Sequence, residues 1–337
     1  PEDCLSFHKS VERRILPVVK EMQRKRKKEL KIDALRPWDL MVDSEGKEPL
    51  RPFKTIEELV QGCQTIFQRL DPELSGYFEE MHHLGLLDLE NRKNKAPGGF
   101  QHALEESKYP FIFMNAVGLH RDMEVLLHES GHAFNYYLSC FDPIVMYRHP
   151  PIEFAEVASM SMELLGSQHW NVFYSEEDAL RARKQALEGI LDFFPWCCTI
   201  DAFQHEIYTR PTLDIQEREN IWQEVFLRFN GEVDWTGLEP YQAALWQKQL
   251  HLFECPFYYI EYGLAQMGAL QIWLAAKENS KEALQKYKKA LSLGGRKKLR
   301  ELYQAAGIEL VFEEDKIAYI VDRLMEEYNF ICEQLKS

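Results

Sequence analysis

Five residues near the middle of the chain, His128-Glu129-Ser130-Gly131-His132, constrain its fold more than any other segment. Apolar residues recur around them at helical spacing. On a helix, positions i and i+4 share a face, so both imidazoles can reach one ion. Imidazole nitrogens suit zinc, and Glu129 can accept a proton from an attacking water without binding the metal. The segment therefore predicts a helix that carries a zinc site and a general base.

A zinc site of this kind needs a third protein ligand. No further histidine follows His132 at close spacing, and the next helix is expected to begin after Pro150-Pro151. This helix holds Glu153, Glu156 and Glu163. Glu156 lies among apolar residues, where a carboxylate needs a partner, and we predict it as the third ligand. Glu163, two turns further on the same face, is either an acceptor for a ligand histidine or part of an ordinary salt bridge.

Most of the remaining sequence has the pattern of helices. Residues 5–31 form a long amphipathic stretch, and a β-strand is expected at 110–117, where it could offer an edge to an extended peptide. After Gly118 nearly everything is predicted to be helical, over 121–139, 151–167, 176–208, 214–229, 239–250, 257–277, 279–292, 296–305 and 312–335. This indicates a mostly α fold with a small β element before the H-E-x-x-H helix.

Composition argues against two classes of partner. Acidic residues outnumber basic ones by 54 to 40, and the net charge of −14 repels phosphate backbones, so no nucleic acid is expected. No apolar run approaches the roughly 18 residues of a membrane-spanning helix, so no membrane is expected either.

The seven cysteines are odd in number, scattered and without C-x-x-C. This favours reduced structural thiols in a cytoplasmic protein over disulfides or a cysteine-based zinc site. His205, which Glu206 follows, lacks the second histidine of the metal motif and is interpreted as a core or hydrogen-bonded histidine.

Five blocks in a fixed order carry a resemblance to a known family. They are Asp88–Lys93 with Lys95–Gly99, Pro110–Asn115, His128–Ala133, Phe154–Ser159, and His251 followed by Pro256–Tyr262. Over roughly residues 85–265, which hold these blocks, the chain resembles the thimet oligopeptidase and oligoendopeptidase F family of zinc metallopeptidases, on the oligoendopeptidase F or Pz-peptidase side.

The resemblance implies a zincin-type helical catalytic lobe, with a deep channel that admits short peptides and excludes folded proteins. It implies that His128, His132 and Glu156 bind one Zn²⁺ per chain. It also implies that Glu129 is the base.

The segment 251–262 is expected to supply further groups. Zinc stabilises only part of the negative charge on the former carbonyl oxygen, and a phenol or imidazole donor adds a few kcal/mol. By resemblance, His251 and Tyr262 stabilise this oxyanion, while Tyr258 and Tyr259 contact substrate. Which tyrosine reaches the oxyanion stays open, and an aromatic core stripe is the alternative for Tyr258 and Tyr262.

We expect residues 1–87 to form a helical part of the channel wall and residues 88–337 the peptidase region. Gly98 and Gly99 are expected in a flexible loop that faces substrate. Family members carry a further helical region before the point where this chain starts, so the far wall is expected from a missing N-terminal region or from self-association.

The predicted function is a zinc endopeptidase that hydrolyses short peptides, with water activated by zinc and Glu129. One alternative is a zinc carboxypeptidase with the same motif, although no basic residue that would hold a free C-terminus is identified. The other is a truncated, inactive peptide-binding module.

Overall fold

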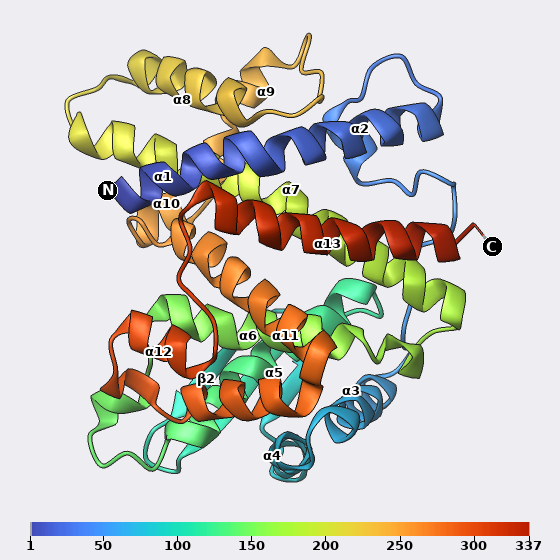
Figure 1. Ribbon diagram of the computed structural model, residues 1–337, viewed down its shortest axis with the longest axis vertical. Helices are drawn as coiled ribbons and strands as arrows, with labels where there is room; N and C mark the ends of the chain where they lie inside the picture. The colour runs from blue at the N-terminus through green and yellow to red at the C-terminus, as the bar shows by residue number, and fades with distance from the viewer. Residues whose placement is uncertain (1, 337) are drawn as a thin grey trace. The chain divides into compact units, whose positions relative to one another are not determined.

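The computed structural model describes residues 2–336, and most of them are helical (Figure 1). The elements are α1 (Glu2–Ser10), the π-helix η1 (Val11–Ile15), α2 (Leu16–Leu30), η2 (Pro37–Leu40), α3 (Ile56–Leu70), α4 (Pro72–His83), β1 (Leu87–Glu90), β2 (Phe100–Leu104), β3 (Tyr109–Ala116), α5 (His120–Ser139), η3 (Val145–Arg148), α6 (Ile152–Ser167), η4 (Trp170–Val172), α7 (Glu176–Thr209), α8 (Ile215–Phe229), α9 (Glu239–Ala243), η5 (Leu245–Lys248), α10 (His251–Glu254), α11 (Tyr259–Leu291), η6 (Gly294–Arg296), α12 (Leu299–Ala305) and α13 (Glu314–Gln334). The mostly α fold with a small β element before α5 is confirmed.

The described residues form two compact units, each built from segments that are distant in sequence. Unit 1 contains residues 2–49, 186–264 and 311–328. Unit 2 contains residues 50–185, 265–310 and 329–336. The predicted boundary at residue 88 separates two consecutive parts of the chain, whereas each unit combines several segments. This boundary therefore stays a prediction.

The sheet of unit 2 has the strand order β1-β3-β2, with β1 parallel and β2 antiparallel to β3. Alternate residues of β3 are buried, as expected for a strand with one face on the core. The strand predicted at 110–117 is therefore confirmed, but its expected free edge is wrong. β3 is the central strand, paired with β2 along Tyr109–Phe113 on one edge and with β1 along Ile112–Ala116 on the other, so β1 and β2 provide the outer edges of the sheet.

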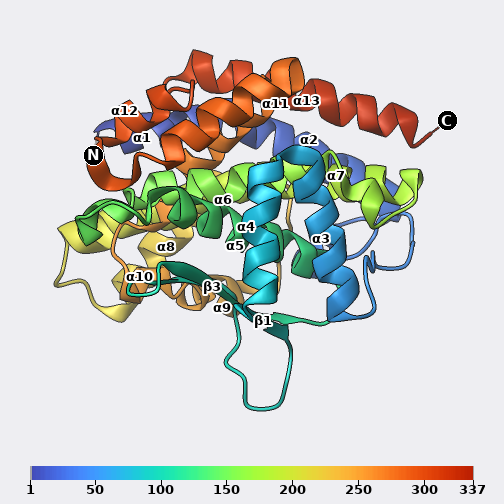
Figure 2. The ribbon, with the colours of Figure 1, turned by 90° about the horizontal axis from the view of Figure 1, so that it is seen from below.

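Helices α5 and α6 pack against each other at a glycine. A Cβ on Gly131 would lie 2.6 Å from Cα of Ser159 and 2.7 Å from the carbonyl oxygen of Ala158. Only a residue without a side chain permits this approach of two helix backbones. The buried Tyr287 of α11 donates a hydrogen bond to the same carbonyl oxygen (2.8 Å). The antiparallel pair α3 and α4 lies beside these elements in unit 2 (Figure 2).

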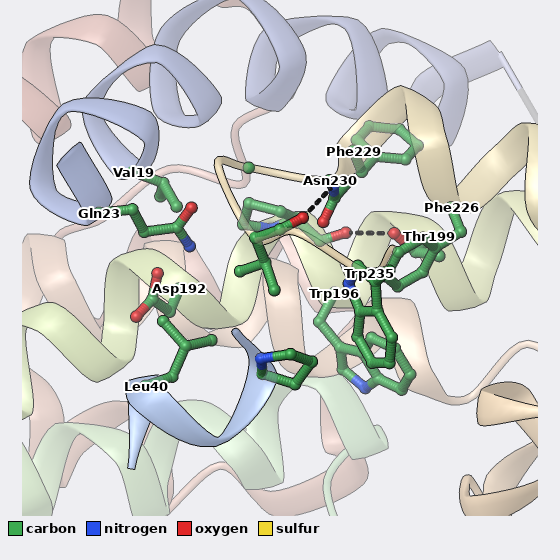
Figure 3. A pocket seen from close by; sticks show the side chains of 14 residues that line it. Val19, Gln23, Leu40, Asp192, Trp196, Thr199, Phe226, Phe229, Asn230 and Trp235 are labelled. Carbon is green, nitrogen blue, oxygen red and sulfur yellow. Dashed lines mark hydrogen bonds between the residues drawn. The ribbon is translucent and has the colours of Figure 1, made fainter. Parts of the chain in front are cut away.

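In unit 1 the N-terminal helices and α13 run side by side in the same direction (Figure 1). Arg14 forms an ion pair with Glu314 at the start of α13, and Lys25 lies over the ring of Tyr328 further along. The same unit holds an apolar pocket of about 180 Å³ (Figure 3). Trp196, Phe226 and Trp235 are among the residues that line it, and it contains none of the predicted site residues.

Two expectations about the whole chain can be compared with the structure. Across residues 2–336 no helix is both long and apolar enough to cross a bilayer. The seven cysteines, all of which lie within the described residues, are unpaired, as the sequence pattern predicts.

The close approach of α5 and α6 yields a stability prediction. Replacing Gly131 by alanine forces two helix backbones apart, and we expect a loss of roughly 1–3 kcal/mol in the free energy of unfolding. In the matched control, Gly76→Ala in α4, the new methyl group meets no atom within 4 Å. Alanine is the better helix former, so this control should gain about 0.5–1 kcal/mol. Urea unfolding of both variants checks this, and shifts of the same sign would contradict it.

Candidate metal centre

Two neighbouring helices of unit 2 bring the three predicted zinc ligands together. His128 and His132 come from one face of α5, and Glu156 comes from the first half of α6. Nε2 of His128 lies 3.4 Å from Oε2 of Glu156, and Nε2 of His132 lies 3.5 Å from the same oxygen. The ligand atoms of all three residues are within 4.8 Å of one another.

This geometry fits a zinc ion. Ligand atoms at 2.0–2.1 Å from one tetrahedral zinc lie about 3.3–3.4 Å from one another. The two measured nitrogen–oxygen distances at Glu156 are within about 0.2 Å of that spacing, and the donor set of two imidazoles and one carboxylate is one that zinc prefers. The residues present could therefore hold the ion without rearrangement of the helices.

Glu163, seven residues beyond Glu156 on α6, lies against the predicted ligand His128. Its Oε1 is 2.6 Å from Nδ1 of His128. A carboxylate can only accept a hydrogen bond from the ring, so Nδ1 carries the hydrogen and Nε2 faces Glu156. Arg121 lies 3.9 Å from the other oxygen of Glu163. Of the two sequence interpretations of Glu163, the geometry favours the acceptor for a ligand histidine.

Burial and charge act in opposite directions on the groups of this centre. Burial disfavours the charge of Glu156, yet the hydrogen bond from His128 and the nearby His132 hold the pKa of this carboxyl well below its usual range. Burial also lowers the pKa of His128, but the two carboxylates beside it, Glu156 and Glu163, outweigh burial and raise it. The site therefore stabilises positive charge beside Glu156, and a divalent cation would supply it.

Glu129 lies on the same helix with a different environment. It is 7% exposed, and burial raises the pKa of its carboxyl to about 7, although the charge of His128 acts in the opposite direction. The backbone of Gln101 in β2 hydrogen-bonds to Glu129. This places an edge strand of the sheet beside the carboxylate, a neighbour that the sequence pattern does not reveal.

The aromatic residues predicted for the oxyanion and substrate form one cluster in unit 1. The ring of His251 stacks on Tyr258, with centroids 5.4 Å apart, and meets Tyr259 and Tyr262 edge-on at 5.2 and 5.7 Å. The hydroxyl of Tyr262 donates to that of Tyr258 (3.2 Å). The four residues therefore lie together, whereas the metal ligands belong to unit 2.

Gln249 is a member of this cluster that the sequence analysis missed. Trp196 donates its ring hydrogen to the amide oxygen of Gln249 (3.2 Å), so the amide nitrogen faces Nδ1 of His251 (2.7 Å). An amide nitrogen only donates, and the neutral ring of His251 therefore carries its hydrogen on Nε2. The spacing Gln-x-His has no recognisable sequence signature, so only the fold reveals this contact.

The glycines expected to face substrate lie where the β1–β2 loop, which leaves the sheet as an extended segment, enters β2 (Figure 2). Gly98 has φ +103°, a conformation that favours glycine. The side chain of Asn115 in β3 donates to the carbonyl oxygens of Ala96 and Gly98 (2.8 and 3.1 Å). A Cβ on Gly99 would come within 3.1 Å of Val125 in α5. Their role toward substrate stays a prediction.

Known proteins of the kind that the sequence resembles are similar to most of this chain. The chain is 26% identical over 313 residues to an oligoendopeptidase F homolog of Borreliella burgdorferi, covering 88% of this chain and 50% of the relative. It is 25% identical over 312 residues to the corresponding homolog of Mycoplasma pneumoniae, covering 85% and 48%. The chain thus spans about half the length of these curated relatives.

One solved structure and one family model also match most of this chain. The structure of Pz peptidase A with an inhibitor superposes with a TM-score of 0.91 at 31% identity, covering 97% of this chain and 58% of that one. The model of peptidase family M3 matches residues 1–320. The resemblance to oligoendopeptidase F and Pz-peptidase is confirmed, and the chain belongs to peptidase family M3.

Proposed function

We propose that this chain carries the catalytic centre of a zinc-dependent endopeptidase that hydrolyses short peptides. The observation that carries the proposal is the arrangement of His128, His132 and Glu156, in which both imidazole nitrogens lie from the carboxylate oxygen at the spacing of zinc ligands. Membership of peptidase family M3 and the similarity to oligoendopeptidase F homologs support a metallopeptidase that acts on peptides.

A bound Zn²⁺ would act as a Lewis acid toward the attacking water and the scissile carbonyl. Glu129 takes the proton of that water and then delivers it to the leaving amine. The raised pKa of Glu129, about 7 because of burial, suits a group that must both accept and release a proton near neutral pH. The buried setting strengthens each of these electrostatic interactions.

His251 and Tyr262 act as hydrogen-bond donors to the oxyanion in this proposal, and Tyr258 and Tyr259 contact substrate. One contact supports the role of His251: the amide of Gln249 keeps its ring hydrogen on Nε2. The hydroxyl of Tyr262, which donates to Tyr258 in this structure, would turn its single hydrogen to the oxyanion when substrate binds. Donors whose orientation is set by neighbours stabilise developing charge without reorganisation.

The edge of β2 is the peptide-binding edge in this proposal, in place of the paired strand β3. An extended peptide can add a strand to an exposed sheet edge, where main-chain hydrogen bonds hold it independently of its side chains. The backbone of Gln101 in this strand already contacts Glu129, so a peptide on β2 would pass close to the base. Such a mode suits short peptides of varied sequence, because it needs no pocket for a particular side chain.

Three features of the setting of the enzyme stay predictions. We propose a cytoplasmic location on the pattern of unpaired cysteines. The far wall of the channel, expected from a missing N-terminal region or from self-association, stays a prediction. Short peptides are the proposed partners.

The role of Glu129 can be tested by Glu129→Gln. Glutamine keeps the shape but cannot take a proton, so we expect kcat on a fluorogenic peptide to fall about 10²–10⁴-fold while zinc content by mass spectrometry stays unchanged. Glu153→Gln, at the partly buried second residue of α6, is the matched control and should retain activity. Turnover like the wild type in Glu129→Gln would contradict the proposal. Peptide binding without cleavage by the zinc-loaded wild-type chain would instead favour the peptide-binding module.

The contact between Glu163 and His128 predicts an effect on metal affinity. Glu163→Ala removes the acceptor that orients the ligand ring, and we expect the zinc dissociation constant to rise about 10- to 100-fold. Competition with a chromophoric chelator measures this constant, and Glu153→Ala serves as the control. An unchanged constant would show that Glu163 is only part of a salt bridge with Arg121.

The choice between the two tyrosines can be tested by phenylalanine substitution. If Tyr262 donates to the oxyanion, Tyr262→Phe should lower kcat about 10²-fold or more with little change in KM. Tyr258→Phe, which removes the neighbouring hydroxyl, should mainly change KM. The reverse pattern, measured by steady-state kinetics on the same peptide, would assign the oxyanion to Tyr258.

A further inference from the structure

Helices α1 and α7 of unit 1 bring a second group of metal-ligating side chains together. Cys4 and His8 are four residues apart on α1, and Asp201 and His205 are four residues apart on α7, so each pair shares a helix face. Nε2 of His8 lies 2.8 Å from Oδ2 of Asp201, and both side chains are fully buried. The rings of His8 and His205 meet edge-on at 6.3 Å.

Three polar atoms of this group are buried and lack a hydrogen-bond partner. They are Nδ1 of His8, Oδ1 of Asp201 and Nε2 of His205. Burying such an atom without a partner is unfavourable, and folded proteins rarely tolerate several in one place. The cluster therefore calls for an additional partner, and Oδ1 of Asp201 together with Nε2 of His205 offers a cation two ligand atoms.

The spacing of the donors matches the candidate metal centre in unit 2. The ligand atoms of Cys4, Asp201 and His205 all lie within 4.8 Å of one another. Nε2 of His205 is 3.3 Å from Oδ2 of Asp201, which agrees with the about 3.3–3.4 Å between nitrogen and oxygen ligands of one tetrahedral zinc. Among the residues that the structure describes, the only other cluster of this kind is the set His128, His132 and Glu156.

We propose that Cys4, Asp201 and His205 bind a second divalent transition-metal ion, of the zinc class. A thiolate and an imidazole select zinc or a similar metal over magnesium or calcium, which prefer oxygen ligands. His8 holds Asp201 through its Nε2 hydrogen and so orients the carboxylate toward the ion. The half-buried Cys4 and the side chain of His205, which is 25% exposed, leave a path from solvent.

The ion would join two helices that are far apart in sequence. Asp201 follows Cys4 by 197 residues, so the metal would close a long loop between α1 and α7. Because only the folded chain brings these ligands together, the ion binds the folded state in preference to the unfolded one and stabilises it. The expected role is therefore structural, in unit 1, and it is independent of the proposed peptidase chemistry.

The sequence patterns do not reveal this site, because its ligand residues lie far apart in the chain. The residue four positions before His205 is an aspartate rather than a histidine, and the cysteine lies on another helix. A search for H-E-x-x-H or C-x-x-C spacing therefore misses it. The expectation that no cysteine takes part in a zinc site is the one that this proposal replaces.

Cobalt binding tests the proposal separately from the peptidase centre. Co²⁺ bound by a thiolate shows a sulfur-to-metal charge-transfer band, and His128, His132 and Glu156 provide no sulfur. The starting protein is therefore the full chain with His128→Ala and His132→Ala, titrated with Co²⁺ alone. We expect about one bound Co²⁺ per chain, the charge-transfer band, and a higher melting temperature than without Co²⁺.

Single changes in this background then assign the ligands. Cys4→Ser should abolish the band and the rise in melting temperature, and His205→Ala should weaken cobalt binding at least about 10-fold. Cys255→Ser, at an exposed cysteine outside the cluster, is the matched control and should keep both signals. Absence of the band before any change at Cys4, or its persistence in Cys4→Ser, would overturn the proposal.

Discussion

The candidate peptidase centre depends on the contact between α5 and α6 at Gly131. A helix holds two histidines on one face by its own periodicity, but a third ligand must come from a neighbouring element at the correct distance. The backbone of α6 comes so close to Gly131 that a single methyl group would collide with it. This contact brings Glu156 within 3.4–3.5 Å of both imidazole nitrogens, which makes the three residues one site.

Because the site is buried, each of its charged groups needs a partner of opposite charge. A carboxylate among apolar residues is stable only beside positive charge, and the shifted pKa values of Glu156 and His128 express this requirement. Glu129 has less compensation, so burial raises its pKa and suits it to proton transfer. The same reasoning applies to Cys4, Asp201 and His205, where the unpartnered atoms indicate a cation of the same class in unit 1.

Local sequence predicted much of the fold and the centre. The helix around His128, the strand at 110–117 and the glutamate on the next helix all follow from short-range spacing and from the cost of an isolated buried charge. The short strands β1 and β2 were not predicted, because four or five residues beside a glycine-rich loop carry little periodic signal. The pairing of both edges of β3 was missed for the same reason, and so was the contact between Gln249 and His251.

The sequence by itself determined which chemical groups the chain possesses and which of them share a helix face. Helical periodicity is local, so the pair His128 and His132 was readable without a structure. The tertiary structure decided which of those faces meet. Glu163 with His128, and His8 with Asp201, are separated by 35 and 193 residues, and their contacts depend on how helices pack. Packing follows from the complementary shapes of many side chains at once, and no short segment encodes it.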